Sequence, residues 1–310
     1  TTGIQNTLIG GLAGDAITTA SYNTAIGYAS LGANTTGVQN VALGAGALIN
    51  NTTAHNNTAV GYNSLLVNTT GTQNTAIGTF SLDANTTASN NTAVGYQTLT
   101  ANTTGSANTA LGNFSLIANT TAANNTAVGY ASLSANTTGA SNVALGAYAL
   151  DANTTASNNV GIGLNAAGAT TTGASNIAIG TNSLLQNTTG ALNVAVGTYA
   201  LNANTTAANN TAVGHSALTA NTTGSENVAI GAQAGDAITT GANNISIGYM
   251  ALGAETTGGR SVAIGRNALL VQNFTGDELP YNVGVGYGAG AAVTTGTQNT
   301  FVGALTGDAT

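Results

Sequence analysis

The sequence predicts an all-β fold, a parallel β-solenoid (β-roll) of about eighteen coils with 17 residues each. A glycine that follows Ile, Leu or Val recurs eighteen times, and consecutive copies lie one coil length apart except between Gly265 and Gly286. The segments between these glycines are too short for helices and are separated by Asn-Thr-Thr turn signals. A strict period over many copies indicates one structural unit that stacks on its neighbours.

Each coil is expected to contain two short strands and a turn. In the second copy the strands are Thr24-Ala25-Ile26 and Ala29-Ser30-Leu31, because β-branched residues favour strands. The aliphatic residue before each glycine and the leucine four positions after it are expected to form the core. An Asn stands four residues before nearly every glycine, and stacked carboxamides of this kind can hydrogen-bond from coil to coil.

The chain is expected to form one continuous domain over 1–310, because each coil contacts only its neighbours and stacking sets no upper length. One coil has a longer loop at 272–281, with four extra residues and the only proline. A loop that projects from a rigid scaffold is a common place for recognition, although an insertion without function explains it equally well. The candidate binding residues are Asn273, Phe274, Asp277, Glu278, Pro280 and Tyr281.

The composition excludes several classes of partner. Lys is absent, and Arg260 and Arg266 are the only basic residues apart from two histidines, so the chain lacks the cations that nucleic-acid binding needs. There is no long apolar run and no cationic leader, so we expect no membrane span and no signal peptide within this numbering. Only 4% of the residues in the chain are charged, and a surface with so little charge suits contact with copies of itself or a covering of sugar.

No group of residues has the pattern of a catalytic site. His55 and His215 stand alone in unrelated positions of the repeat, and there is no cysteine. The carboxylates of Asp15, Asp236 and Asp308 lack the further oxygen ligands that Ca²⁺ requires. We therefore expect no catalytic residue, no cofactor and no metal site, and the protein is not expected to be an enzyme.

The Asn-Thr-Thr segments match the acceptor pattern for N-glycosylation and fall in the expected turns. Asn and Thr are also the residues that turns prefer, so sugar attachment and a purely structural role both remain open. The candidate acceptors are Asn34, Asn51, Asn68, Asn85, Asn102, Asn119, Asn136, Asn153, Asn187, Asn204 and Asn221.

Aromatic residues recur with a period of two coils in the first half of the chain. Duplication of a two-coil segment explains this period, and so does a stripe of rings that faces a neighbouring chain. One set directly follows the glycine and the other lies one place later: Tyr62, Tyr96 and Tyr130, then Phe80, Phe114 and Tyr148.

The two ends of the sequence keep the phase of the repeat and together supply one full period. Neither end resembles the polar cap that usually protects the open end of a solenoid. Subunits are therefore expected to stack end to end, unless the chain is an excerpt of a longer repeat protein. The expected axial interface consists of Thr1, Thr2, Gly3, Gly307, Asp308, Ala309 and Thr310.

The segments 176–180, 227–231 and 261–265 resemble the head repeat of YadA-like trimeric autotransporter adhesins, for example in Asn227-Val228-Ala229-Ile230-Gly231. The longer unit Asn-Thr-Ala-Val-Gly-Tyr with Asn-Thr-Thr-Gly is similar to repeats of bacterial surface proteins and phage tail-fibre-like proteins. This resemblance implies an extracellular β-roll, often trimeric, that serves in adhesion or as a stalk.

The leading expectation is a structural subunit of an extracellular filament that assembles with itself by head-to-tail stacking. The alternative is an adhesin or tail-fibre head that binds a receptor, a glycan or a matrix surface. Both hypotheses place the protein outside the cell or at its surface. Ice binding through the Thr-Thr columns is a third interpretation, disfavoured because adjacent residues of a strand point to opposite faces.

Overall fold

The computed structural model describes residues 2–276 and 278–308, and within them the fold is all-β with eighteen parallel strands and no helix. The expected β-solenoid, with its coil length set by the repeat, is therefore confirmed. The chain divides into two compact units, Thr1–Ser157 and Asn158–Thr310. Each unit is itself a solenoid, and a single continuous domain stays a prediction.

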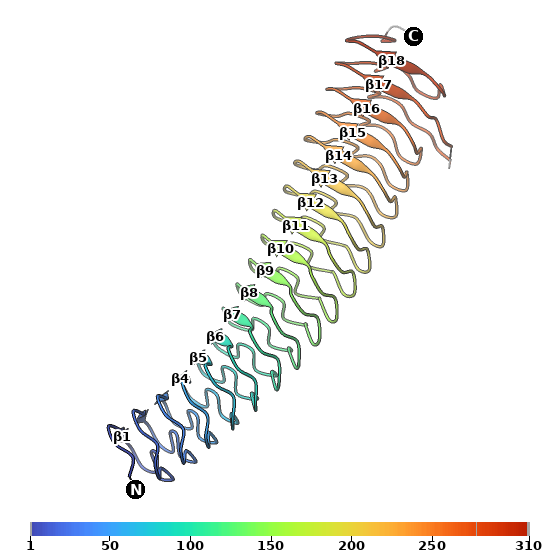
Figure 1. Cartoon of the computed structure of the whole chain (residues 1–310). Helices are drawn as coiled ribbons and strands as arrows, with labels where there is room; N and C mark the ends of the chain where they lie inside the picture. Colours follow the sequence, from blue (N-terminus) through green and yellow to red (C-terminus); the bar gives the residue numbers. More distant parts are fainter. Residues whose placement is uncertain (1, 277, 309–310) are drawn as a thin grey trace. The chain divides into compact units, whose positions relative to one another are not determined.

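The first unit holds nine strands of three residues, each one coil after the last (Figure 1). Neighbouring strands pair in parallel with a constant offset of one coil, as Thr24 with Val41 and Ile26 with Leu43. The strands are β1 (Thr7–Ile9), β2 (Thr24–Ile26), β3 (Val41–Leu43), β4 (Thr58–Val60), β5 (Thr75–Ile77), β6 (Thr92–Val94), β7 (Thr109–Leu111), β8 (Thr126–Val128) and β9 (Val143–Leu145).

The second unit repeats this arrangement. The four extra residues of the longer coil leave the register intact, because Val262 pairs directly with Val283. Its strands are β10 (Val160–Ile162), β11 (Ile177–Ile179), β12 (Val194–Val196), β13 (Thr211–Val213), β14 (Val228–Ile230), β15 (Ile245–Ile247), β16 (Val262–Ile264), β17 (Val283–Val285) and β18 (Thr300–Val302).

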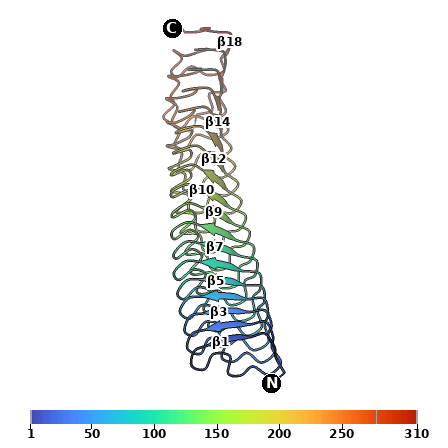
Figure 2. The same ribbon diagram turned by 90° about the vertical axis from the view of Figure 1, so that its left-hand side faces the viewer.

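Each coil contains one strand, so the second strand expected at 29–31 is wrong. The described residues hold one three-residue strand for each coil, and the strands shown as arrows in Figure 2 all lie on one side of the coils. Ala29 and Leu31 both have a φ of 54°, in the left-handed region, which costs roughly 1–2 kcal/mol for such residues. Burial of the leucine offsets this cost, and Leu31 N still donates to Ala47 O of the next coil at 2.9 Å.

Only one of the two aliphatic columns that the sequence predicts for the core is buried. The leucine column is fully buried, as at Leu31 and Leu48, but the aliphatic residue before the glycine points outward, and Leu43 is 43% exposed. The strand residue that points inward is the central alanine, such as Ala42, because successive strand residues face opposite sides. A Cβ at Gly284, in the same position, would lie 2.9 Å from Leu269 Cγ, so this column faces the leucines.

The repeated glycine is required by the contact between coils. Gly27 has a φ of 133°, and a Cβ there would lie 2.7 Å from the carbonyl carbon of Gly44 in the next coil. Any side chain at this corner would push the coils apart.

Two columns of buried asparagines join the coils. In the column before the glycine, Asn57 N donates to Asn40 Oδ1 at 3.0 Å, and Asn57 Nδ2 donates to Gly71 O at 2.8 Å. The expected coil-to-coil bonding of this column is confirmed, although most of its bonds join side chain to backbone. Direct bonds between carboxamides occur chiefly in the Asn-Thr-Thr column, where Asn51 Nδ2 donates to Asn34 Oδ1 at 3.0 Å.

One coil offers a matched test of the core assignment, because Leu116 is fully buried and Leu111 is 46% exposed. We expect Leu116→Ala to lower the free energy of unfolding by about 3 kcal/mol, since it leaves a cavity. Leu111→Ala should cost less than about 1 kcal/mol. Denaturation midpoints of the two variants compare them directly, and equal losses would contradict the inward leucine and outward aliphatic arrangement.

Candidate functional site

The eleven candidate glycosylation asparagines are fully buried. Asn51 Nδ2, for example, donates both to Asn34 Oδ1 and to Ala54 O, at 3.0 Å each. A sugar on this nitrogen would remove a donor and would have no path to solvent, so these positions cannot carry glycans in the folded chain. The structural interpretation of the pattern is the one that fits Asn34, Asn51, Asn68, Asn85, Asn102, Asn119, Asn136, Asn153, Asn187, Asn204 and Asn221.

The two threonines of the Asn-Thr-Thr segment have different environments. Thr35 is half-buried and its Oγ1 donates to Thr52 O of the next coil at 3.1 Å, whereas Thr36 is exposed. The two columns therefore do not form one exposed array, and this weakens the ice-binding hypothesis.

A buried carboxylate replaces asparagine just before the longer coil. Glu255 is fully buried, and its Oε1 accepts hydrogen bonds from the backbone N–H groups of Thr256, Thr257 and Gly258. The same oxygen accepts from Phe274 N at 3.2 Å, and Oε2 accepts from Gln272 Nε2 at 3.0 Å. Glu255 thus joins its own turn to the start of the loop. This role was missed in the sequence analysis, because the only signal for it is that Glu255 stands where other coils have the Asn of Asn-Thr-Thr.

The base of the loop is closed by a second buried amide. Gln272, the first residue of the loop, accepts through Oε1 from Nδ2 of Asn282, which directly follows the loop, at 2.9 Å. Thr257 Oγ1 also donates to Phe274 O at 2.8 Å. The loop is therefore held at its base by the preceding coil, which makes it a defined element of the structure.

Only part of the predicted binding loop faces solvent. Phe274 and Pro280 are buried and Asn273 is half-buried, while Glu278 and Tyr281 are exposed. Asp277 lies outside the described residues. The exposed surface is thus smaller than the sequence suggests.

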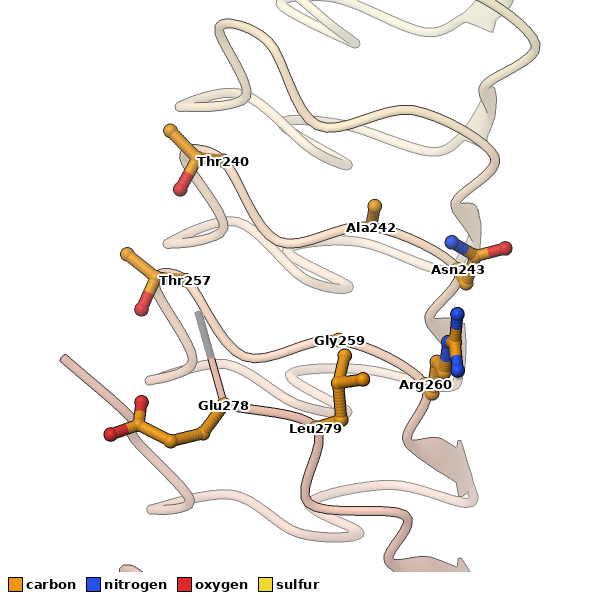
Figure 3. A pocket seen from close by; sticks show the side chains of 8 residues that line it. All are labelled: Thr240, Ala242, Asn243, Thr257, Gly259, Arg260, Glu278 and Leu279. Carbon is orange, nitrogen blue, oxygen red and sulfur yellow. The ribbon is translucent and has the colours of Figure 1, made fainter. Parts of the chain in front are cut away.

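A shallow hollow of about 160 Å³ lies beside the loop (Figure 3). Arg260 Nη1 donates to Tyr281 OH at 2.9 Å, and the guanidinium carbon is 5.8 Å from the centre of that ring. Glu278 lies at the other end of the hollow, and its Oε2 accepts from Gly276 N at 2.9 Å. Among the described lining residues, the Arg260 guanidinium and the Glu278 carboxylate thus lie at opposite ends of the hollow.

The remaining sequence candidates are dispersed. His55 is exposed, and the ring of His215 packs edge-on against Tyr199 at 6.3 Å. Among the described residues, no three His, Cys, Asp or Glu side chains gather as metal ligands. Over the same residues, no helix has the length and apolarity that crossing a membrane requires.

The expected axial interface is described in part. Thr2 and Asp308 are exposed, Gly3 and Gly307 are half-buried, and Thr1, Ala309 and Thr310 lie outside the described residues. Thr2 N donates to Thr18 O at 2.9 Å, so the first described coil bonds to the second by the usual pattern. Contact between the two sets of residues stays a prediction.

An outward apolar face of the sheet was not anticipated. In the second unit the first and third residues of the nine strands point outward, and they are Val or Ile except for Thr211 and Thr300. All of them are half-buried or exposed, and none is charged. In the first unit Thr takes the first strand position except at Val41 and Val143, which makes that face more polar.

No family model matches the chain, and no curated protein matches it either. The resemblance of 227–231 and its equivalents to YadA-like heads and tail-fibre-like proteins therefore stays a prediction from the sequence.

Isolated carboxylates form the main electrostatic feature. Asp83, Asp151 and Asp236 follow the core position of their coils, and desolvation by burial raises the pKa of each above its ordinary value. Backbone hydrogen bonds from each aspartate's own residue and the next one offset part of this rise. The charged form is thus disfavoured in the folded state.

Asp83→Asn should stabilise the protein at neutral pH. A raised pKa in the folded state means that the folded protein binds the proton more tightly than the unfolded chain. Burial of the charged carboxylate therefore costs no stability below the ordinary pKa of aspartate, and this cost grows as pH rises until it is complete above the raised pKa. We expect a higher Tm for Asp83→Asn at pH 7 and no gain at pH 3. The exposed Asp308→Asn serves as control, and a gain that is equal at both pH values would refute the assignment.

Glu255→Ala should release the loop, because it leaves four backbone N–H groups without their acceptor, at about 1–3 kcal/mol for each unsatisfied group. We expect faster proteolysis within 273–281 and faster hydrogen exchange at Phe274 N. Glu278→Ala removes an exposed carboxylate of the same loop that bonds to Gly276 N, and it should leave hydrogen exchange at Phe274 N unchanged. Unchanged exchange in Glu255→Ala would mean that the buried carboxylate does not hold the loop.

Proposed function

We propose that the chain is a structural part of an extracellular fibre and that it assembles with copies of itself. The observation that carries this proposal is the outward Val and Ile face of the second unit. Apolar patches of several hundred Å² on a protein surface often mark interaction sites.

The size of the face supports an interface. Nine coils at about 4.8 Å and strands of three residues at about 3.3 Å make a surface of roughly 40 by 10 Å. Its area, on the order of 400 Å², equals that of the largest apolar patch on a typical monomer, which is often functional. It is about half of what one partner contributes to a standard interface, so flanking residues must contribute as well.

The period of the face favours a second copy as the partner. Its side chains form ridges at the spacing of the coils, and such ridges interdigitate along their whole length only with a surface of the same repeat. Another copy of this chain supplies that repeat.

End-to-end stacking extends the same principle. Each described coil joins the next within its unit by backbone hydrogen bonds, and a coil of another copy can be added by the same bonds. Residues Thr1 to Gly3 and Gly307 to Thr310 are the proposed contact. The extracellular location rests on the resemblance to surface proteins and on the low charge.

An adhesin or tail-fibre head is the second candidate function. The loop held by Glu255 presents Glu278 and Tyr281 to solvent in a defined conformation, and a preformed loop is suited to binding a receptor.

Charges on the outward face should prevent lateral assembly. We expect wild-type protein to form oligomers or fibres in sedimentation and electron microscopy, and Val196→Glu with Ile230→Glu to shift the protein to monomers. A buried unpaired charge costs several kcal/mol. Thr240→Glu, at an exposed threonine on the opposite side of the coil from the strands (Figure 3), should leave assembly unchanged. A wild-type chain that stays monomeric at all concentrations would overturn the proposal.

A further inference from the structure

A row of exposed tyrosines runs along the first unit. Tyr28, Tyr62, Tyr96 and Tyr130 each follow the repeated glycine, and their side chains are 64%, 52%, 42% and 47% exposed. They lie two coils apart, so the coil spacing places successive tyrosines about 9.6 Å from each other.

Neighbouring rings hold most of this row in place. Tyr62 packs edge-on against Phe80, with ring centres 5.4 Å apart and planes at 84°. Phe114 contacts both Tyr96 and Tyr130, at 5.6 and 5.7 Å, again nearly perpendicular. Such contacts restrict the tyrosine rings, so little conformational entropy is lost when a ligand binds to them.

We propose that the tyrosine row binds a linear, neutral polysaccharide, with one disaccharide for each pair of coils. A pyranose ring has an apolar C–H face that stacks on an aromatic ring, and hydroxyls around its rim. In an extended β-1,4-linked chain the same ring face recurs at every second sugar, which is close to the repeat of the row.

Polar groups lie between the tyrosines. Thr79 and Asn113 occupy the same position of the coils that separate Tyr62, Tyr96 and Tyr130. Asn113 Oδ1 accepts from Tyr96 N at 2.9 Å, which leaves the exposed amide nitrogen to donate to a sugar hydroxyl. Tyrosine hydroxyls both donate and accept.

The charges favour a neutral polymer. Residues 1–157 contain no Lys or Arg, and the whole chain has a formal net charge of −7. An acidic polysaccharide would find no cation along this row and would be repelled by the net charge.

Binding should depend on the length of the sugar chain. The four tyrosines span six coils, about 29 Å, and linked contacts in one ligand raise the affinity without any new type of contact. We expect the affinity for cello-oligosaccharides or N-acetylated chito-oligosaccharides to rise at least about tenfold from two to six sugars and to level off near eight.

Moving one tyrosine by one coil tests the spacing itself. The variant Thr79→Tyr with Tyr96→Thr keeps the composition and column but breaks the two-coil period. We expect it to bind a hexasaccharide about tenfold more weakly than the wild type. Tyr22→Ala removes an exposed tyrosine outside the row and should bind normally. Because the chain has no Trp, tyrosine fluorescence reports binding, and calorimetry measures the affinity.

Two results would overturn the inference: no binding of either oligosaccharide series, or equal binding by the wild type and the shifted-tyrosine variant. If that variant instead changes only the sedimentation of the protein, the row contacts another copy and the polysaccharide proposal fails. The proposed assembly is tested separately, at Val196 and Ile230 in the other unit.

Discussion

The alignment of equivalent residues in successive coils is the constraint on which each unit depends. Buried asparagines maintain it: Asn34 and Asn51 bond directly, and Asn40 binds the backbone of Asn57. Hydrogen bonds of this kind satisfy groups that would be costly to bury alone. Since the partners of each coil lie in its neighbours, one isolated coil has no stable structure and the stack is the folding unit.

A thin interior follows from this alignment. With backbone glycines such as Gly27 and Gly44 in contact and a leucine entering from most turns, the facing strand position usually has room only for a small residue such as alanine. One coil exchanges the two sizes: where Gly14 replaces the leucine, Leu8 replaces the alanine, and a Cβ at Gly14 would lie 2.8 Å from Leu8 Cδ2. Larger aliphatic residues are left on the outside, where they form the apolar face.

The functional proposals share one physical basis, which is the presentation of side chains at multiples of the coil spacing. The Val and Ile face repeats with every coil and suits a partner with the same repeat. The tyrosine row repeats with every second coil and suits a partner whose own repeat is twice the coil spacing. The loop after Val271 occurs once among the described coils, and Glu255 holds it in place through Phe274 N. Periodic surfaces and a single loop therefore suggest different kinds of partner.

The sequence by itself determined the coil length, the fold class and the coil-to-coil bonding of Asn40 and its equivalents, because a strict period places identical residues in register. The same period located the loop at 272–281. The sequence did not show that the buried side chains of Glu255 and Gln272 hold this loop by hydrogen bonds, because residue spacing does not reveal such contacts. Only the tertiary structure decided that Ala42 faces inward and Leu43 outward, because hydrophobicity favours the larger residue while the thin interior admits the smaller. It also decided that Asn34 is buried, since a turn pattern is the same whether its side chain faces solvent or the next coil.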